Sequence, residues 1–151
     1  MLAHVPGRVV IFRVAAQYYA LDVMAIERVI RYVAPRTIPM ASNDFSGVID
    51  VEGRLVPVVD LRDRFGGEAG SANGRVLLVS DAGSVMGFVV DQVLEVRSVE
   101  ASDVEPAPTA MVKGDGPVVF LGTIRRGGDV VLLVEVGALL AATRPATASV
   151  A

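Results

Sequence analysis

Two aspartates that directly follow apolar runs, Asp60 and Asp91, are the residues with the clearest potential for chemistry. A pair of carboxyl groups at a controlled separation can serve as general acid and general base. An aspartate at a strand end more often caps a helical turn or satisfies the backbone of a tight turn. Because the neighbouring sequence offers no nucleophile, oxyanion donor set or metal-binding partner, we expect capping and no catalytic role.

Other reactive residue types are scarce. The chain has no cysteine and a single histidine, His4, which precedes the first strand-like run. These absences disfavour thiol chemistry, a Ser–His–Asp triad and a multi-ligand metal site, so we expect no metal and no cofactor. His4 is expected to be a solvated tail residue. Arg62 and Arg64, on a short turn, can contact an acidic partner, but a solvated face is the default expectation.

Length and composition set the class of protein. A chain of 151 residues with 52% hydrophobic and 21% charged residues is the size of one compact domain. Its net charge of −3 argues against a nucleic-acid partner. No apolar run reaches the ~18 residues of a membrane span, and the first residues do not resemble a secretory signal. We therefore expect a soluble cytoplasmic protein with no direct membrane insertion.

The elements that position these residues are short. Runs of Val, Leu and Ile broken by Gly, Pro and Asp predict many short strands and an all-β barrel architecture. The expected strands are 8–14, 17–21, 28–32, 47–51, 54–59, 75–80, 85–90, 92–99, 118–124 and 130–134. Pro57 lacks an N–H and is expected at an edge or bulge.

Short helical turns and loops connect these strands. Asp22 and Asp60 are expected to cap helical turns through residues 26 and 65, and a capped turn is expected near residues 102–106. Residues 33–46 and 66–74 are expected to be irregular, and 125–129 to form a hairpin turn. A terminal helix is expected over 136–143.

Three segments together resemble one protein family. Residues 47–65, GVIDVEGRLVPVVDLRDRF, resemble the pattern G-V-hydrophobic-N-L-R-G-x-V-hydrophobic-P-hydrophobic-hydrophobic-D-L-R of the CheW family of chemotaxis coupling proteins. Residues 87–96, GFVVDQVLEV, are similar to its G-hydrophobic-V-V-D-x-V-x-x-V segment. The pair FLGTI (120–124) and VLLV (131–134) is similar to its closing hairpin. The resemblance extends from Arg8 to Ala142.

The resemblance implies a fold and a function. The fold is two small five-stranded SH3-like barrels that share a hydrophobic core, over residues 8–142, with flexible tails at 1–7 and 143–151. The function is non-enzymatic: coupling a chemoreceptor's cytoplasmic helical tip to the regulatory domain of a CheA-type histidine kinase. The receptor tip lies in a groove between the barrels and the kinase contacts one barrel. A further contact, with other CheW-like proteins, helps to build rings in receptor arrays.

The resemblance also assigns a receptor-binding groove. Its positions are Ile26, Arg28, Gly47, Glu52, Val76 and Val96. Burial statistics alone favour ordinary strand packing for the three apolar members, whereas exposed apolar residues in a groove would receive a partner helix. Gly47 is expected to be a tight backbone position.

Two of these positions depart from the family pattern. Glu52 stands where the family has Arg, and Arg28 stands where many members have Glu, with Glu27 and Arg54 close by. One interpretation is a partner surface of inverted charge, which changes specificity more than fold. The other is four solvated side chains whose pairing contributes about 0–1 kcal/mol.

Three alternatives to a chemotaxis adaptor remain at this point. A paralogue that serves type IV pilus motility or surface sensing has the same sequence features. A small-ligand-binding barrel needs polar groups that converge on an enclosed pocket, whereas the inward positions here are Val, Leu and Ile. A carboxylate enzyme would use Asp60 and Asp91.

Overall fold

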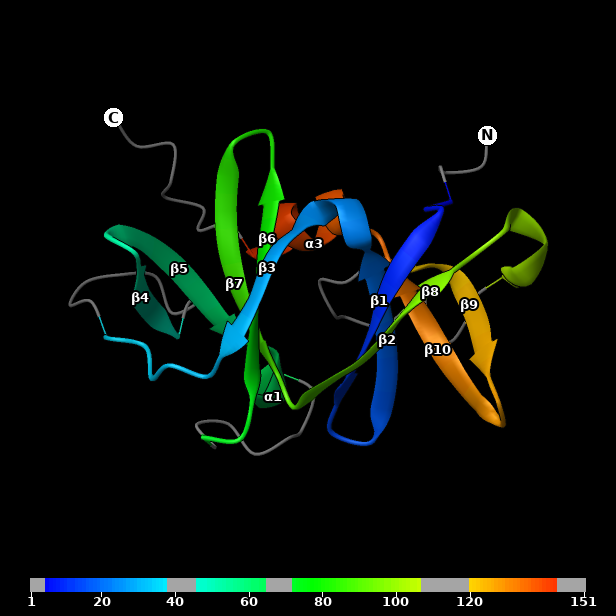
Figure 1. Ribbon diagram of the computed structural model, residues 1–151, viewed down its shortest axis with the longest axis horizontal. Helices are drawn as coiled ribbons and strands as arrows, with labels where there is room; N and C mark the ends of the chain where they lie inside the picture. The colour runs from blue at the N-terminus through cyan, green and yellow to red at the C-terminus, as the bar shows by residue number, and fades with distance from the viewer. Residues whose placement is uncertain (1–4, 38–45, 65–71, 107–119, 144–151) are drawn as a thin grey trace.

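The computed structural model describes residues 5–37, 46–64, 72–106 and 120–143, and these form two five-stranded sheets with short helices (Figure 1). The elements in chain order are β1 (Arg8–Val14), β2 (Gln17–Asp22), η1 (Val23–Ala25), β3 (Ile26–Arg31), β4 (Gly47–Val51), β5 (Arg54–Asp60), α1 (Leu61–Arg64), β6 (Arg75–Asp81), β7 (Ser84–Val90), β8 (Gln92–Ser98), η2 (Ala101–Asp103), β9 (Phe120–Arg126), β10 (Asp129–Val134) and α3 (Val136–Thr143).

The two sheets exchange strands. Barrel A is the sheet with the order β8-β1-β2-β10-β9, and barrel B is the sheet with the order β3-β6-β7-β5-β4. Strand β3 follows β2 of barrel A in the chain but pairs with β6 of barrel B. Strand β8 follows β7 of barrel B but pairs with β1 of barrel A. The chain therefore passes between the barrels twice. Each barrel is completed by an outer strand, β8 or β3, that continues directly from the other barrel.

The two central hairpins, β1–β2 and β6–β7, are buried on both faces. Alternate side chains of these strands point into their own barrel or toward the other one. In β6, Val76 and Leu78 lie inside barrel B, whereas Leu77 and Val79 join a cluster shared by both barrels. This double burial explains why the hairpin sequences are nearly continuous apolar runs rather than alternating ones.

The shared cluster is the larger hydrophobic core. It contains aromatic side chains from both barrels, and Phe12 stacks on Tyr19 with ring centroids 5.8 Å apart. Two residues of helix α3, Leu139 and Leu140, cover it and are 2% exposed. Burying a large apolar side chain contributes about 1.5–3 kcal/mol, so this cluster holds the barrels together. The expected shared core of two SH3-like barrels is confirmed.

Most expected elements are present, with shifted ends. Asp22 accepts the Met24 N–H at 2.9 Å and caps η1, as predicted. Strand β3 begins earlier than expected because Ile26 already pairs with Val79, across a bulge. Strand β9 extends to Arg126, which pairs with Asp129, so the closing hairpin turns on two glycines only.

The expectation that Pro57 occupies an edge or bulge is wrong. Strand β5 is internal, between β4 and β7. Pro57 is opposite Val48, and the N–H and C=O of Val48 both bond Arg36 on the other side of β4, at 2.9 and 2.8 Å. The Val48–Pro57 pair is therefore a non-hydrogen-bonded pair of the ladder. On the β7 side, pairing begins only at Val58, so the missing N–H leaves no described partner without its bond.

The N-terminal segment is packed before β1 begins. Val5 packs against the interior cluster of barrel A, and the Gly7 carbonyl accepts the Val99 N–H at 2.9 Å. The expected tail over residues 1–7 is thus anchored from Val5 onward. His4 lies outside the described residues. So do most of the two segments expected to be irregular, 33–46 and 66–74, and most of the expected C-terminal tail over 143–151. In the described ranges, no helix is long and apolar enough to cross a membrane.

Side-chain ion pairs bridge the outer strands of barrel A. Glu95 of β8 and Arg126 of β9 lie 2.6 Å apart, although these strands are at opposite ends of the sheet order. Arg97 of β8 also donates to the Arg125 carbonyl at 2.8 Å. The hydrogen bond from Arg126 is the main cause that lowers the pKa of Glu95, with the nearby charge of Arg97 adding to it.

Because its pKa is lower in the folded state, Glu95 stabilises the fold above the ordinary glutamate pKa of about 4.3. That contribution is lost as the pH falls through the folded-state pKa. We expect an NMR titration to place the Glu95 midpoint below the ordinary value, and Arg126→Gln to raise it. The control is Arg8→Gln, at the exposed start of β1 in the same barrel. An unchanged midpoint in Arg126→Gln would refute this ion-pair effect.

Candidate functional site

A buried ion pair lies where β5 meets α1. The Arg62 side chain is 0% exposed, and its Nε and Nη2 donate to the two oxygens of Asp60 at 3.0 and 2.9 Å. Asp60 also accepts the Arg62 backbone N–H at 3.0 Å, which is the expected cap. The expectation of a solvated Arg62 is wrong, because the bidentate contact pulls the guanidinium inward. Of Arg64, only its place in α1 is described.

The buried guanidinium connects distant segments of barrel B. Its Cζ lies 5.1 Å from the centre of the Tyr32 ring, which follows β3. A side chain at Gly74, just before β6, would place its Cβ 2.8 Å from Nη1 of Arg62. Ser46, before β4, accepts the Asp60 N–H at 3.0 Å. The hydrogen bond with Asp60 raises the pKa of Arg62, against the lowering effect of burial. One guanidinium thus fixes the ends of several strands.

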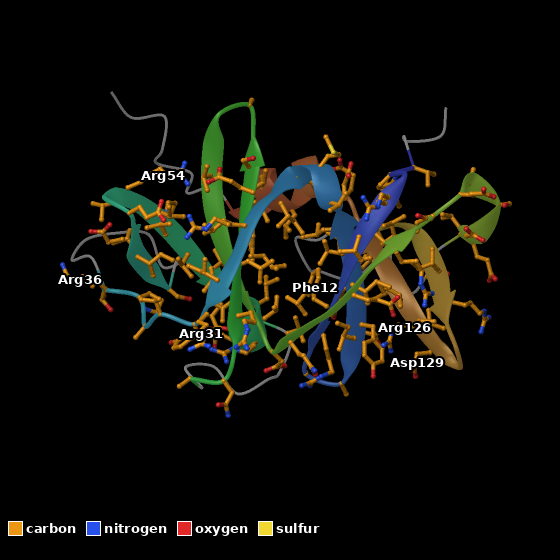
Figure 2. The ribbon with its side chains drawn as sticks, in the orientation of Figure 1. Phe12, Arg31, Arg36, Arg54, Arg126 and Asp129 are labelled. Atoms are coloured by element: carbon orange, nitrogen blue, oxygen red, sulfur yellow. The ribbon has the colours of Figure 1, made fainter. Side chains whose placement is uncertain are left out.

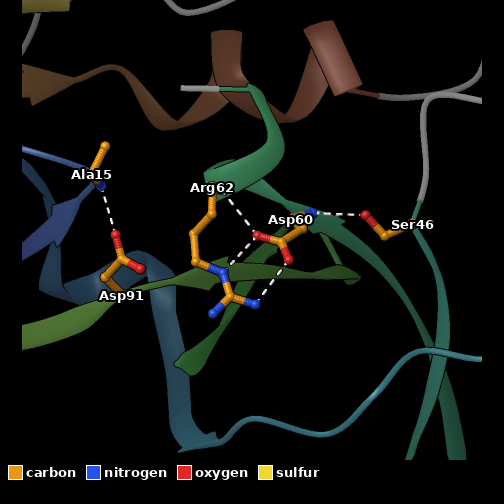
Figure 3. A network of polar contacts seen from close by, with 5 residues as sticks. All are labelled: Ala15, Ser46, Asp60, Arg62 and Asp91. Carbon is orange, nitrogen blue, oxygen red and sulfur yellow. Dashed lines mark hydrogen bonds and ion pairs between the residues drawn. The ribbon is translucent and has the colours of Figure 1, made fainter. Parts of the chain in front are cut away.

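Asp91 connects this region to barrel A (Figure 3). Its carboxylate accepts the Ala15 N–H at 2.6 Å in the β1–β2 turn and lies 3.7 Å from Arg13. Ala15 has a φ of +55°, which an alanine adopts at a cost, so this contact helps to hold the turn. Asp60 and Asp91 therefore satisfy a cap and a turn, as expected, and each already has its own partners.

The charges that depart from the family pattern meet on the surface of barrel B. Arg28 lies 3.1 Å from Glu52, and Arg54 lies 2.5 Å from Glu27. Strand β3 provides one member of each pair, and the β4–β5 hairpin provides the other. We call these four residues the charge clasp. Its side chains are 36–74% exposed, so each pair contributes little stability, about 0–1 kcal/mol.

The other positions predicted for the groove have different surroundings. Val76 is 0% exposed inside barrel B, and Ile26 is partly buried against the shared core. Gly47 is buried at φ +145°, and a Cβ there would lie 2.3 Å from the Arg36 carbonyl oxygen. Val96, on β8 of barrel A, is 48% exposed. The structure thus brings Arg28 and Glu52 together, whereas Val76 and Gly47 support the surface from within.

Exposed apolar side chains near the charge clasp were not predicted. Met24 is 86% exposed, Leu55 is 66% exposed and Val29 is 41% exposed. In the sequence they belong to ordinary strand-like apolar runs. Val29 lies on β3, which has only β6 as a neighbour in the sheet, whereas Met24 lies in η1 and Leu55 at the start of β5. Leu55 also lines a surface cavity of about 250 Å³ with Val33, Val48 and Arg36.

Two intertwined five-stranded barrels with charged and apolar outer strands place this chain in the class of SH3-like β-barrel proteins. The model of the CheW-like domain family matches residues 8–144. The chain therefore belongs to the CheW-like domain family.

Known proteins of similar sequence cover most of the chain. The chemotaxis protein CheW of Klebsiella aerogenes is 29% identical over 86% of this chain and 79% of its own length. That of Bacillus subtilis is 24% identical over 88% and 86%. The crystal structure of the scaffolding protein TtCheW from Thermoanaerobacter tengcongensis is similar, with a TM-score of 0.70, 26% identity, and coverage of 88% and 86%.

The buried pair predicts strong coupling between its members. We expect Arg62→Met to lower the free energy of unfolding by about 3–5 kcal/mol, because it leaves Asp60 buried and uncompensated. Asp60→Asn keeps a capping oxygen but removes the charge. The double variant should lose much less than the sum of the two single variants. Urea unfolding measures all three, with exposed Asp63→Asn as the control, and additive losses would contradict the coupling.

Proposed function

We propose that this chain is a non-enzymatic adaptor that couples a chemoreceptor's cytoplasmic helical tip to the regulatory domain of a CheA-type histidine kinase. Family membership over residues 8–144 is the observation that carries this proposal. The scaffolding title of the similar solved structure is consistent with it. Cytoplasmic residence, recruited to receptor arrays, follows from the same proposal, as does a contact with other CheW-like proteins in rings.

The surface around β3 supports the receptor side of the proposal. Val29 directly follows Arg28 of the charge clasp in β3 and is exposed, Met24 is exposed in η1 just before β3, and Val96 is exposed on the neighbouring barrel. A helix with an apolar stripe and a polar margin is recognised by such a combination. The groove is therefore proposed to comprise the exposed members Arg28, Glu52 and Val96, with Ile26, Gly47 and Val76 shaping it from beneath.

The charge clasp supports a specificity role. Relative to the family pattern, Arg28 and Glu52 have exchanged signs, and they face each other at 3.1 Å. The ion pair is thus kept while the charge that each strand offers to a partner is reversed. Because such exposed pairs add little stability, we propose that the reversal selects a partner of correspondingly reversed charge.

The proposed mechanism is positional. The shared core makes one body of the two barrels, so partners bound to different faces are held at a fixed geometry. A conformational bias in the receptor can then shift the populations of the kinase, provided that the contacts differ between states. No bond is made or broken by the adaptor.

The three alternative functions differ in how well they agree with the structure. Described side chains fill both barrel interiors, seven buried residues in each, which speaks against a ligand-binding barrel. The carboxylate enzyme would need Asp60 free, but its carboxylate is committed to buried Arg62. A paralogue for type IV pilus motility or surface sensing uses the same surfaces with other partners. It remains the second candidate because the charge reversal indicates an altered partner.

Isothermal titration calorimetry tests the adaptor directly. The full chain is titrated with the kinase regulatory domain and with the receptor tips encoded in its own genome. We expect micromolar binding to the kinase domain and to at least one receptor tip, typical of modest exchangeable interfaces. Tips from a pilus or surface-sensing pathway form the parallel arm. Absence of binding to every kinase domain would overturn the proposal.

Reversal of the charge clasp tests specificity. We expect Glu52→Arg to change receptor-tip affinity at least a few-fold while the thermal midpoint stays nearly constant. The double variant Arg28→Glu with Glu52→Arg restores the family's signs and the ion pair, so it should favour a different set of tips. The control is Asp129→Lys, an exposed charge on barrel A. Unaltered affinity for every tip would contradict a specificity role.

A further inference from the structure

An asparagine followed by a glycine leads into β6. Asn73 is exposed in the turn before this strand, Gly74 is buried, and β6 begins at Arg75. The chain has two asparagines, and the other one, Asn43, is followed by Asp44. The backbone nitrogen after an asparagine attacks the side-chain amide most readily when it belongs to a glycine, because glycine has no Cβ to hinder the approach. Asn73 is therefore a candidate for deamidation without an enzyme.

The reaction consumes one water and releases one ammonia. The Gly74 nitrogen loses its proton and bonds to Cγ of Asn73, and the side-chain nitrogen leaves as ammonia. Water then opens the resulting five-membered imide. Breaking the bond between the Gly74 nitrogen and Cγ gives aspartate, whereas breaking its bond to the backbone carbonyl carbon gives isoaspartate, whose main chain runs through Cβ and Cγ. Either product carries a carboxyl group, which is ionised at neutral pH.

Positive charges surround this step. Arg75 donates from Nη1 to the Gly74 carbonyl at 3.0 Å and to the Asn73 carbonyl at 3.5 Å. Asn73 and Arg75 also line the same surface cavity. Arg31, which Figure 2 shows at the end of β3, is the register partner of Arg75, and like charges at such positions repel. Nearby positive charge favours both the deprotonated Gly74 nitrogen and the carboxylate product.

Gly74 itself is tightly packed. A Cβ there would lie 2.7 Å from the Val90 carbonyl oxygen and 2.8 Å from Nη1 of Arg62. The Gly74 carbonyl accepts the Tyr32 N–H at 3.2 Å. Aspartate leaves the path of the main chain unchanged, whereas isoaspartate adds one atom to it directly before this glycine. Because a close-packed interior does not absorb such a change freely, isoaspartate must displace Gly74 relative to Arg62.

We propose that Asn73 is a site of spontaneous deamidation, and that the turn before β6 accommodates the aspartate product but not the isoaspartate product. Water is the co-reactant. As the protein ages, the reaction adds a negative charge beside Arg75, and in the isoaspartate fraction it loosens the contact between Gly74 and Arg62. The proposal goes beyond the adaptor function and does not depend on it.

Ageing of the folded full chain in water labelled with oxygen-18 tests the chemistry. Peptide mapping by mass spectrometry should find one labelled oxygen in a new carboxyl group at Asn73. Asn43 is the internal control and should react more slowly, because the side chain of Asp44 hinders the attack. Asn73→Gln keeps an amide but would need a larger ring, so it should stay unlabelled. Labelling at Asn43 as fast as at Asn73, or no labelling at Asn73, would overturn the proposal.

The stability of the two products tests the packing. Asn73→Asp reproduces the aspartate product, and ion-exchange chromatography separates the isoaspartate form from the aged chain. At low salt we expect Asn73→Asp to keep or raise the urea midpoint, since the new charge faces Arg75, and the isoaspartate form to lower it. Ser84→Asp, at the exposed start of β7, controls for added charge.

An NMR signal reports on the contact itself. The Nε–H signal of Arg62 should keep its position in Asn73→Asp and shift in the isoaspartate form. A lower urea midpoint in Asn73→Asp than in the unmodified chain would overturn the proposal. An isoaspartate form with an unchanged midpoint or an unchanged Arg62 signal would also overturn it.

Discussion

The buried guanidinium of Arg62 is the constraint on which the rest of barrel B depends. Removing such a charge from water costs several kcal/mol unless it is paired and hydrogen-bonded. Asp60 provides both contacts from two residues away, which fixes the junction of β5 and α1. The same guanidinium needs the Tyr32 ring above it and a glycine at position 74 beside it. The ends of β3, β5 and β6 are thereby placed, and the charge clasp joins β3 to the β4–β5 hairpin.

The exchange of strands explains why two small barrels act as one body. A five-stranded barrel of this size buries few residues on its own, seven in the interior cluster of each. The cluster between the barrels is larger, and it uses the second face of each central hairpin. Separation would expose that cluster and leave β3 and β8 without partners. A rigid relation between the outer surfaces therefore follows from core packing, which suits a protein that holds partners in place.

The positions of the charged residues on this protein matter more than its net charge. The outer strands of both barrels are bridged by ion pairs, the partly exposed Glu95 with Arg126 in barrel A and the exposed charge clasp in barrel B. Such pairs add little stability in water, but they determine which signs a partner meets. Arg31 and Arg75, by contrast, are direct register partners of like charge.

The sequence by itself determined the strands, most turns, the aspartate caps and the family, because these depend on local alternation, on turn residues and on short motifs. It also located the four residues of the charge clasp, two of them, Arg28 and Glu52, as departures from a motif and the other two as neighbouring charges. Only the tertiary structure decided that they pair across β3 and the β4–β5 hairpin. It likewise decided that Val76 faces inward, that Pro57 fits an internal strand and that Arg62 is buried. Each of these depends on register and strand order between segments far apart in the chain, which no local pattern encodes.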